Sequence, residues 1–304
     1  MILVCGSAID PVTHFFCERL TDFGNAHRLL DLSRYPTHCK VIQHRSEDGF
    51  SGSISTSQWS VRTDELTGVF VRTNRPEVSQ ESLAGDPAMV AALQTERNLS
   101  LESLLTGIRC PVVNRFESRW SNQSKPYQAL LIRGSLLRIP ATLITNQPVA
   151  AQQFYDEMEG RVIQKSASAR STGTRQLSPV SLRESFTIGS EPVQLQELIN
   201  GQDIRVHIVR DQVFPTLIHS AAIDYRLAED TVRLETALLP SDIAAECLRL
   251  TQRFGLLFSG IDLRLTPDGE YYCFEVNTSP GFAFYEARTG QRISGALAAL
   301  LSGE

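Results

Sequence analysis

The feature that most constrains this chain is the segment Ile261–Asn277, near the end of the sequence. Two runs of alternating apolar and polar residues flank a Pro-Asp-Gly sequence, which predicts an antiparallel hairpin with a tight turn. We expect Thr266 to pair with Tyr271 across this turn. The same register places the carboxylate of Asp262 directly opposite that of Glu275.

Alternation along the two strands then assigns their side chains to two faces. We expect the apolar face to carry Ile261, Leu263, Leu265, Tyr272, Phe274 and Val276. We expect the polar face to carry Asp262, Arg264, Glu275 and Asn277, with Arg264 opposite Cys273. The polar face therefore brings two acidic side chains, an amide and a guanidinium together.

This polar face has the composition of a metal site. Directly opposed side chains have Cβ atoms about 4.5–5.5 Å apart, so two carboxylates there repel each other unless a cation lies between them. The carboxylates of Asp262 and Glu275 and the amide of Asn277 form a partial oxygen cage, which suits Mg²⁺ better than Zn²⁺. The alternative is a solvated outer face of an antiparallel sheet, where acidic residues are common.

Composition limits the classes of protein that remain. The chain has 304 residues, of which 42% are hydrophobic and 21% charged, as is ordinary for a soluble globular protein with two or three subdomains. A net charge of −5 argues against nucleic acid as the main partner, and no apolar run reaches the ~18 residues of a membrane helix. Residues Met1–Gly6 predict a strand and not a signal peptide. The six cysteines form no Cys-x-x-Cys pair, so we expect reduced thiols, no zinc site and a cytoplasmic location.

Hydrophobic periodicity predicts a first domain at residues 1–112, followed by further strands and helices. The first alternates strands and helices, which predicts a small α/β domain with a polar hairpin or loop over Arg45–Ser60. Expected strands are Met1–Cys5, His27–Leu32, Lys40–His44, Thr67–Arg72, Cys110–Asn114, Ile139–Thr145, Arg161–Lys165, Val193–Ile199, Asp203–Arg210 and Val213–His219. Expected helices are Val12–Asp22, Asp86–Gly107, Asn122–Gly134, Gln147–Met158, Ser241–Phe254 with Ser241 as N-cap, and Arg292–Leu301. The Ser-, Thr- and Gly-rich segment Ser166–Gln176 predicts a mobile loop.

Two sequence strings carry a resemblance to a known superfamily. The hairpin and the residues after it read DLRLTPDGEYYCFEVNTSPG, and an earlier segment reads LQELINGQDIRV. Two lysines, Lys125 and Lys165, precede both strings in the chain. Together these features make residues 112–304 resemble the ATP-grasp superfamily. The tail FEVNTSPGFAFYEARTGQRISGALAALL is similar to the branch of ribosomal-protein glutamate ligases and graspetide (microviridin-type) peptide cyclases. The resemblance implies an ATP-grasp fold, preceded here by the α/β domain. In that fold two α+β subdomains clamp ATP, a central or lid subdomain at residues 113–192 and a C-terminal subdomain with the metal site at residues 193–304.

The resemblance also implies roles for individual residues. For the nucleotide it implies Lys125 and Lys165 at the phosphates, Gln196, Glu197 and Ile199 at adenine, and Asp203 at the ribose. For Mg²⁺ it implies the ligands Asp262, Glu275 and Asn277, with Glu275 bridging a pair of ions and Mn²⁺ as a substitute. At the transferred phosphate it implies Lys165, Arg205 and Arg226, under a lid formed by Ser166–Gln176. Considered one at a time, Lys125 and Lys165 could equally be solvated surface residues. Arg205 and Arg226 could equally form surface ion pairs with Asp203 and Asp224.

The activity that the resemblance implies is ATP-dependent carboxylate–amine ligation, an ADP-forming carbon–nitrogen ligase reaction that passes through an acyl phosphate. Its partners are ATP, a carboxylate substrate and an amine acceptor, and these two substrates are either small molecules or a peptide. The sequence does not decide between a monomer and a homo-oligomer. One alternative is a graspetide-type cyclase that forms ester or amide crosslinks in a precursor peptide. Further alternatives are a phosphotransferase that stops at the phosphorylated product and an inactive, ATP-binding regulatory protein.

The strand expected over Thr67–Arg72 runs into a polar loop. Ligands of open α/β sheets gather at the C-terminal ends of the strands. Arg72 and Arg75 are therefore candidates to bind a substrate carboxylate, for which the guanidinium fork is suited. The alternative is that both arginines are solvated or pair with Glu77.

Overall fold

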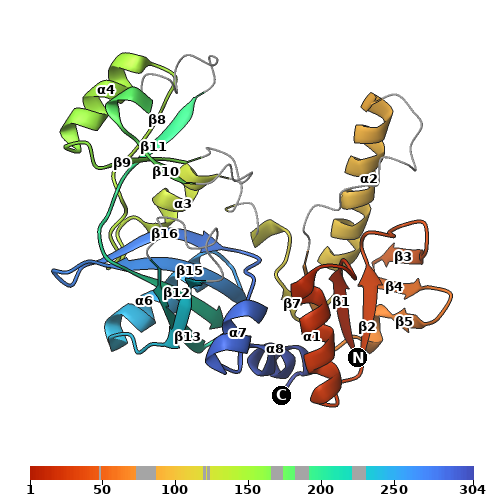
Figure 1. Ribbon diagram of the computed structural model, residues 1–304. Coiled ribbons are helices and arrows are strands. Elements are labelled where there is room, and N and C mark those ends of the chain that lie inside the picture. The colour runs from red at the N-terminus through yellow and green to blue at the C-terminus, as the bar shows by residue number, and fades with distance from the viewer. Residues whose placement is uncertain are drawn as a thin grey trace. The chain divides into compact units, whose positions relative to one another are not determined.

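The chain divides into two compact units in the computed structural model (Figure 1). The structure describes residues 1–47, 49–72, 87–118, 121, 124–165, 174–181, 192–220 and 231–304. The first unit comprises Met1–Arg119, Leu256–Phe258 and Ser279–Glu304, and the second comprises Trp120–Gly255 and Ser259–Thr278. This division differs from the three continuous domains expected from the sequence, because the final segment groups with the N-terminal residues.

The first unit is built on a parallel sheet with the strand order β2-β1-β6-β7. Its strands are β1 (Ile2–Gly6), β2 (His27–Asp31), β6 (Gly68–Val71) and β7 (Val112–Val113). Helix α1 (Pro11–Asp22) begins where the Asp10 carboxylate accepts a hydrogen bond from the Thr13 amide at 2.8 Å. Strands and helices are present at the positions expected for this part of the chain, with β2 to β6 in succession between α1 and the next α-helix.

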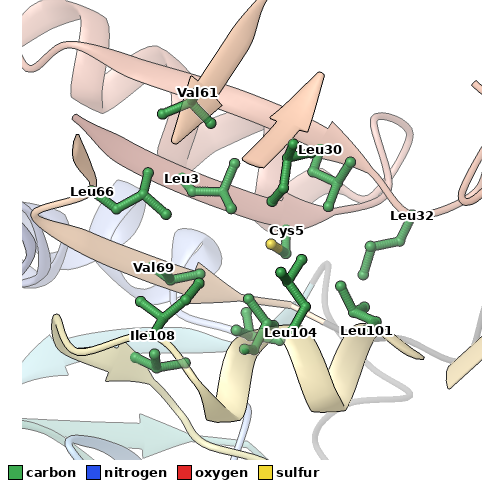
Figure 2. Packing of buried hydrophobic residues seen from close by; sticks show 14 of the residues in the cluster. Leu3, Cys5, Leu30, Leu32, Val61, Leu66, Val69, Leu101, Leu104 and Ile108 are labelled. Atoms are coloured by element: carbon green, nitrogen blue, oxygen red, sulfur yellow. The ribbon is translucent and has the colours of Figure 1, made fainter. Parts of the chain in front are cut away.

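A three-stranded antiparallel sheet lies in the same unit, in the order β3-β4-β5. Its strands are β3 (Lys40–Ser46), β4 (Gly49–Ser55) and β5 (Ser60–Arg62), so the hairpin alternative for Arg45–Ser60 is the one the structure adopts. Both sheets and α2 (Pro87–Thr106) contribute to one hydrophobic core. Figure 2 shows Leu3 of β1, Val61 of β5 and Leu104 of α2 in this core.

The C-terminal segment completes the first unit. It forms α7 (Ala283–Thr289), which the sequence did not predict, and α8 (Ile293–Ser302). Phe282 lies in an aromatic cluster, with ring centroids 6.0 Å from Phe16 and 6.4 Å from Phe70. Helix α8 packs against β6 so closely that a Cβ atom at Gly68 would lie 2.5 Å from the carbonyl oxygen of Leu301. This packing explains why the last residues belong to the first unit.

The second unit contains an antiparallel sheet with the order β10-β9-β11-β8. Its strands are β8 (Thr142–Thr145), β9 (Val162–Lys165), β10 (Arg175–Gln176) and β11 (Val193–Glu197). Helix α4 (Pro148–Glu157) covers one face, where Ala151 and Phe154 pack against Val162 and Leu195. Part of the expected loop Ser166–Gln176 is thus strand β10, and residues 166–173 lie outside the described residues.

The second unit also contains a five-stranded sheet with the order β14-β13-β12-β15-β16. Its strands are β12 (Gln202–Val209), β13 (Gln212–His219), β14 (Arg233–Thr236), β15 (Phe258–Leu265) and β16 (Tyr271–Asn277). Helix α6 (Ser241–Arg253) has Pro240 as its N-cap, so the assignment of Ser241 as N-cap was wrong by one residue. Within the described residues, no helix combines the length and apolar character needed to span a membrane.

Helix α3 (Lys125–Ile132) begins three residues later than expected. Ser124 is its N-cap and accepts a hydrogen bond from the Tyr127 amide, and Pro126 lies in the first turn, where a missing amide proton costs nothing. Lys125 is therefore the first helical residue.

Candidate active site

The β15–β16 hairpin pairs Asp262 with Glu275, as predicted. Nearer the turn, the expected pairing of Thr266 with Tyr271 is wrong. The Thr266 amide instead donates to the carbonyl of Glu270 at 3.0 Å, which places Thr266 in the turn and shifts the strand pairing by one residue. The expected pairing of Asp262 with Glu275 is nevertheless correct, because a second irregularity in the strands restores the register before that pair.

A β-bulge cancels the shift. Leu263 pairs with Cys273 and Asp262 with Glu275, so Phe274 is the additional residue on β16. In a bulge of this kind the additional residue no longer follows simple alternation. Phe274 and Glu275 are both half-buried, whereas Cys273 is fully buried.

The bulge also changes which residues share a face. Arg264 lies opposite Tyr272 and not opposite Cys273. Its guanidinium carbon is 5.2 Å from the centroid of the Phe274 ring, which places Phe274 on the polar face. The assignment of Tyr272 and Phe274 to the apolar face was therefore wrong, and the buried face takes Cys273 in their place.

The three proposed metal ligands share one side of the hairpin. Glu275 and Asn277 lie two residues apart on β16, and Val276 between them is fully buried. Asp262, whose side chain is 14% exposed, accepts a hydrogen bond from Arg205 at 2.5 Å. This ion pair offsets one of the two negative charges, and the remaining carboxylate and amide oxygens suit a hard divalent cation.

Burial of Cys273 keeps the layer beneath the carboxylates uncharged. Desolvation raises the pKa of the Cys273 thiol well above its usual range, and nearby Cys247 and Asp262 act in the same direction. The thiol therefore remains protonated at neutral pH. The site's negative charge comes from carboxylates alone, which again favours a hard cation over Zn²⁺.

Of the proposed nucleotide residues, Lys165 of β9 and Gln196 of β11 lie on the sheet face away from α4, whereas Glu197 lies opposite Val162, which packs against that helix. Strand register places Gln194 opposite Lys165, and Gln196 opposite both Ile163 and Thr142. Both glutamines are buried. The Gln196 side-chain nitrogen donates to the Thr142 hydroxyl at 3.1 Å, and its carbonyl oxygen has no hydrogen-bond partner among the residues that the structure describes. A buried acceptor of this kind fits the amino group of adenine.

The two proposed phosphate lysines come from different elements of the second unit. Lys125 begins α3, and Lys165 ends β9. The Lys165 ammonium lies 5.0 Å from the centroid of the Phe274 ring, in cation–π distance, so this lysine is oriented by the hairpin that carries the metal ligands.

The proposed adenine and ribose residues after β11 are held by Arg264. The Asp203 carboxylate accepts two hydrogen bonds from its guanidinium, and the Ile199 carbonyl accepts a third. The Glu197 amide donates to the Ala141 carbonyl at 2.9 Å. The contacts of Arg264 bring the segment Ile199–Asp203 against β15, near the proposed metal ligand Asp262.

Arg72 lies at the C-terminal end of β6 in the first unit, where the sequence placed it. Its guanidinium is 3.4 Å from the Asp10 carboxylate and donates to the Ser279 carbonyl at 2.5 Å. Arg75 and Arg226 lie outside the described residues.

Sequence reasoning missed Gln128 and the partners of Arg264. The buried side-chain amide of Gln128 donates to the Val276 carbonyl at 2.8 Å and accepts from the Val276 amide at 3.1 Å. The only signal for Gln128 was its position one helical turn after Lys125, which does not identify a partner 148 residues away.

Comparison with known proteins identifies the family of this chain. Residues 121–301, more than half of the chain, match the RimK-like ATP-grasp domain. The chain belongs to the RimK-like ATP-grasp family. This ATP-grasp protein has the mixed α/β fold of that family and is an ADP-forming ligase. ATP-grasp ligases use ATP and Mg²⁺.

Solved structures resemble the ligase over its whole length. Macrocyclase MdnC from Microcystis aeruginosa MRC, bound with precursor peptide MdnA, is 23% identical with a TM-score of 0.86 and covers 100% of this chain and 99% of its own. ATP-grasp ligase PsnB, complexed with a phosphomimetic variant of minimal precursor, Mg and ADP, is 26% identical with a TM-score of 0.82 and covers 99% and 97%. D-alanyl-alanine synthetase A from Vibrio cholerae is 14% identical with a TM-score of 0.62 and covers 99% and 97%. No curated protein matches the sequence.

Proposed function

We propose that this ligase is a peptide macrocyclase, which joins side chains of a precursor peptide through ester or amide crosslinks. The observation that carries the proposal is the full-length match to PsnB, at 26% identity, since PsnB is complexed with a precursor peptide. That match includes residues 1–120, which lie outside the matched ATP-grasp domain. D-alanyl-alanine synthetase A, which joins small molecules by its name, is less similar in fold and sequence.

The residues that we propose for nucleotide binding all belong to the second unit. Lys125 and Lys165 would neutralise the phosphates, Gln196, Glu197 and Ile199 would meet adenine, and Asp203 would accept from the ribose. Asp262, Glu275 and Asn277 would hold a pair of Mg²⁺ ions, with Mn²⁺ as a substitute. Bound metal would supply positive charge at the phosphate oxygens.

The chemistry follows from this arrangement. A carboxylate side chain of the peptide attacks the γ-phosphorus of ATP, and the bond from that phosphorus to the β-phosphate oxygen breaks, which gives an acyl phosphate and ADP. A hydroxyl or amine of the same peptide then attacks the acyl carbon, loses its proton and expels phosphate. Arg205 and Lys165, together with Arg226, would stabilise the charge on the transferred group, and they perform no covalent step.

The decisive experiment supplies ATP, Mg²⁺ and a short precursor peptide encoded beside the gene, and follows ADP release and peptide mass together. The proposal expects loss of one water mass per crosslink, with one ADP released for each. A control with Glu275→Gln should show neither change. ADP release with single amino acids and an unchanged peptide mass would instead support the small-molecule carboxylate–amine ligase, and AMP with pyrophosphate would contradict the acyl phosphate.

A further inference from the structure

Gln194 is a buried polar residue on the same strand as the proposed adenine contact Gln196. It lies two residues before Gln196 on β11, so alternation places both side chains on the sheet face away from α4. Gln194 is 2% exposed and Gln196 is 5% exposed. The carbonyl oxygen of each has no hydrogen-bond partner among the residues that the structure describes. An acceptor buried without a donor is rare, because it has lost its bond to water and gained none. Two such acceptors on one face therefore indicate a ligand that donates to both.

The nitrogen atoms of the two amides differ in their contacts. The Gln196 nitrogen donates to the Thr142 hydroxyl at 3.1 Å, so its carbonyl oxygen is the group that can meet a ligand. The Gln194 nitrogen makes no such contact within the described part of the chain. Gln194 can therefore present a donor and an acceptor together. Strand register places it between Lys165 of β9 and Ile144 of β8.

We propose that Gln194 is a further adenine-binding residue, which binds the edge of the base formed by its amino group and N7. This edge offers one donor and one acceptor, and a glutamine amide can bond to both at once. The second N–H of the amino group would go to Gln196. Two acceptors of one amino group lie about 5 Å apart, and residues i and i+2 of a strand are separated by roughly 6.4–6.8 Å, so two flexible side chains can converge on it. The inference rests on the proposed placement of ATP, and it does not depend on the peptide substrate.

The order of residues along the chain favours this edge of the base. Adenine presents N1, the amino group and N7 in succession, and the chain offers Ile199, Gln196 and then Gln194 in the same order. N7 belongs to the ring that carries the sugar, and Gln194 lies opposite Lys165, which we propose for the phosphates. Guanine has acceptors at both places on this edge, so the Gln194 carbonyl would meet another acceptor there. Gln194 would therefore also contribute to selection of ATP over GTP.

The test measures the affinities of the full-length protein for ATP and for 7-deaza-ATP, in which a C–H group replaces N7, by titration calorimetry with Mg²⁺. Wild type should bind ATP about fivefold more tightly, since one hydrogen bond is lost in the analogue. Gln194→Leu loses the bonds to both the amino group and N7. Its affinity should fall about 25-fold for ATP and about fivefold for 7-deaza-ATP, which brings the ratio to about one.

Two further variants serve as controls. Gln196→Leu should weaken both nucleotides by about fivefold and keep the ratio, because it loses only a bond to the amino group. Gln152→Leu, an exposed position on the helix that covers the other face of the sheet, should change neither affinity. Thermal unfolding without nucleotide checks the fold. Because Gln194→Leu removes a buried acceptor without a donor, its midpoint should be unchanged or higher.

The outcomes separate this contact from other roles of Gln194. Equal loss of affinity for both nucleotides in Gln194→Leu would show that the residue acts on the phosphates through Lys165, and would overturn the inference. A lowered midpoint of unfolding would show a structural role and would overturn it as well. Equal binding of ATP and 7-deaza-ATP by wild type would show that N7 has no partner, while the nucleotide site itself would stand. If wild type binds neither nucleotide, the proposed nucleotide site fails.

Discussion

Replacing Gln128 with leucine should destabilise the second unit by about 2–4 kcal/mol. The Gln128 side chain is only 3% exposed, and its amide satisfies both backbone groups of Val276. Leucine has a similar volume but no polar atom, so the Val276 amide and carbonyl would remain buried without a partner. Each such group costs about 1–3 kcal/mol, and the apolar side chain recovers part of the loss.

The assay is thermal unfolding of the full-length protein without nucleotide. A loss of this size should lower the midpoint by roughly 5–15 °C in a unit of this length. Gln128→Glu is the sharper variant, because a carboxylate still accepts from the Val276 amide but cannot donate to its carbonyl. It should be at least as destabilised as Gln128→Leu, since it also buries a charge near Glu275.

A matched control is Gln152→Leu on α4. Gln152 also donates a side-chain hydrogen bond, to Asp156 at 2.9 Å, but both residues are exposed. Its replacement should change stability by less than about 0.5 kcal/mol. If Gln128→Leu unfolds at the wild-type midpoint, the amide does not secure β16 and the reasoning fails.

Four further predictions test residues of the proposed site and two buried residues elsewhere. Glu275→Gln should abolish Mg²⁺-dependent ADP release and leave the thermal midpoint unchanged or slightly higher, because it removes a repelling carboxylate; wild-type turnover would refute the metal assignment. Gln196→Ala should weaken ATP binding by about 1–2 kcal/mol and reduce the preference for ATP over GTP, and equal use of both nucleotides by wild type would contradict the adenine contact. Arg72→Met should lower the midpoint of unfolding by leaving the buried Asp10 carboxylate without its cation, at about 2–4 kcal/mol; a peptide KM raised more than tenfold with an unchanged midpoint would instead support substrate binding. Burial raises the pKa of the Cys247 thiol from 9.0 to about 12, so unfolding above pH 9 releases a proton. The free energy of unfolding should therefore fall as pH rises toward 12. Cys247→Ala should show a shallower decline in the unfolding midpoint across that range.

The acidic pair was predictable because it depends on local pattern. Alternation and a Pro-Asp-Gly turn are enough to bring Asp262 opposite Glu275, and the structure confirms that pair. The pairing between the turn and this pair was not predictable, because the turn is one residue longer than expected, with Thr266 inside it, and the bulge at Phe274 compensates for the shift. A bulge depends on what the additional side chain can contact, here Lys165 and Arg264, and the contacts between strands far apart in sequence are absent from any local pattern.

The partners of the proposed site residues could not be predicted either, because they lie far away in the sequence. The sequence placed Asp203 and Arg264 on strands near the nucleotide, and it gave no sign that one holds the other. Assigning Asp203 to the ribose considered it as an isolated carboxylate. In the structure both oxygens of this carboxylate accept hydrogen bonds from a residue 61 positions away.

The outer edge of β16 shows how such long-range partners shape the site. β16 is an edge strand of its sheet, and an edge strand exposes unpaired backbone groups that leave its position weakly defined. Near the turn, the backbone of Arg138 bonds to the Tyr271 carbonyl and the Cys273 amide, each at 2.8 Å. Beside the metal ligands, the Gln128 side chain takes over both groups of Val276. Gln128 lies one turn after Lys125 on α3. The helix that carries the proposed phosphate-binding lysine therefore also holds the strand that carries the proposed metal ligands Glu275 and Asn277, so the spacing between α3 and this strand is set by the fold itself.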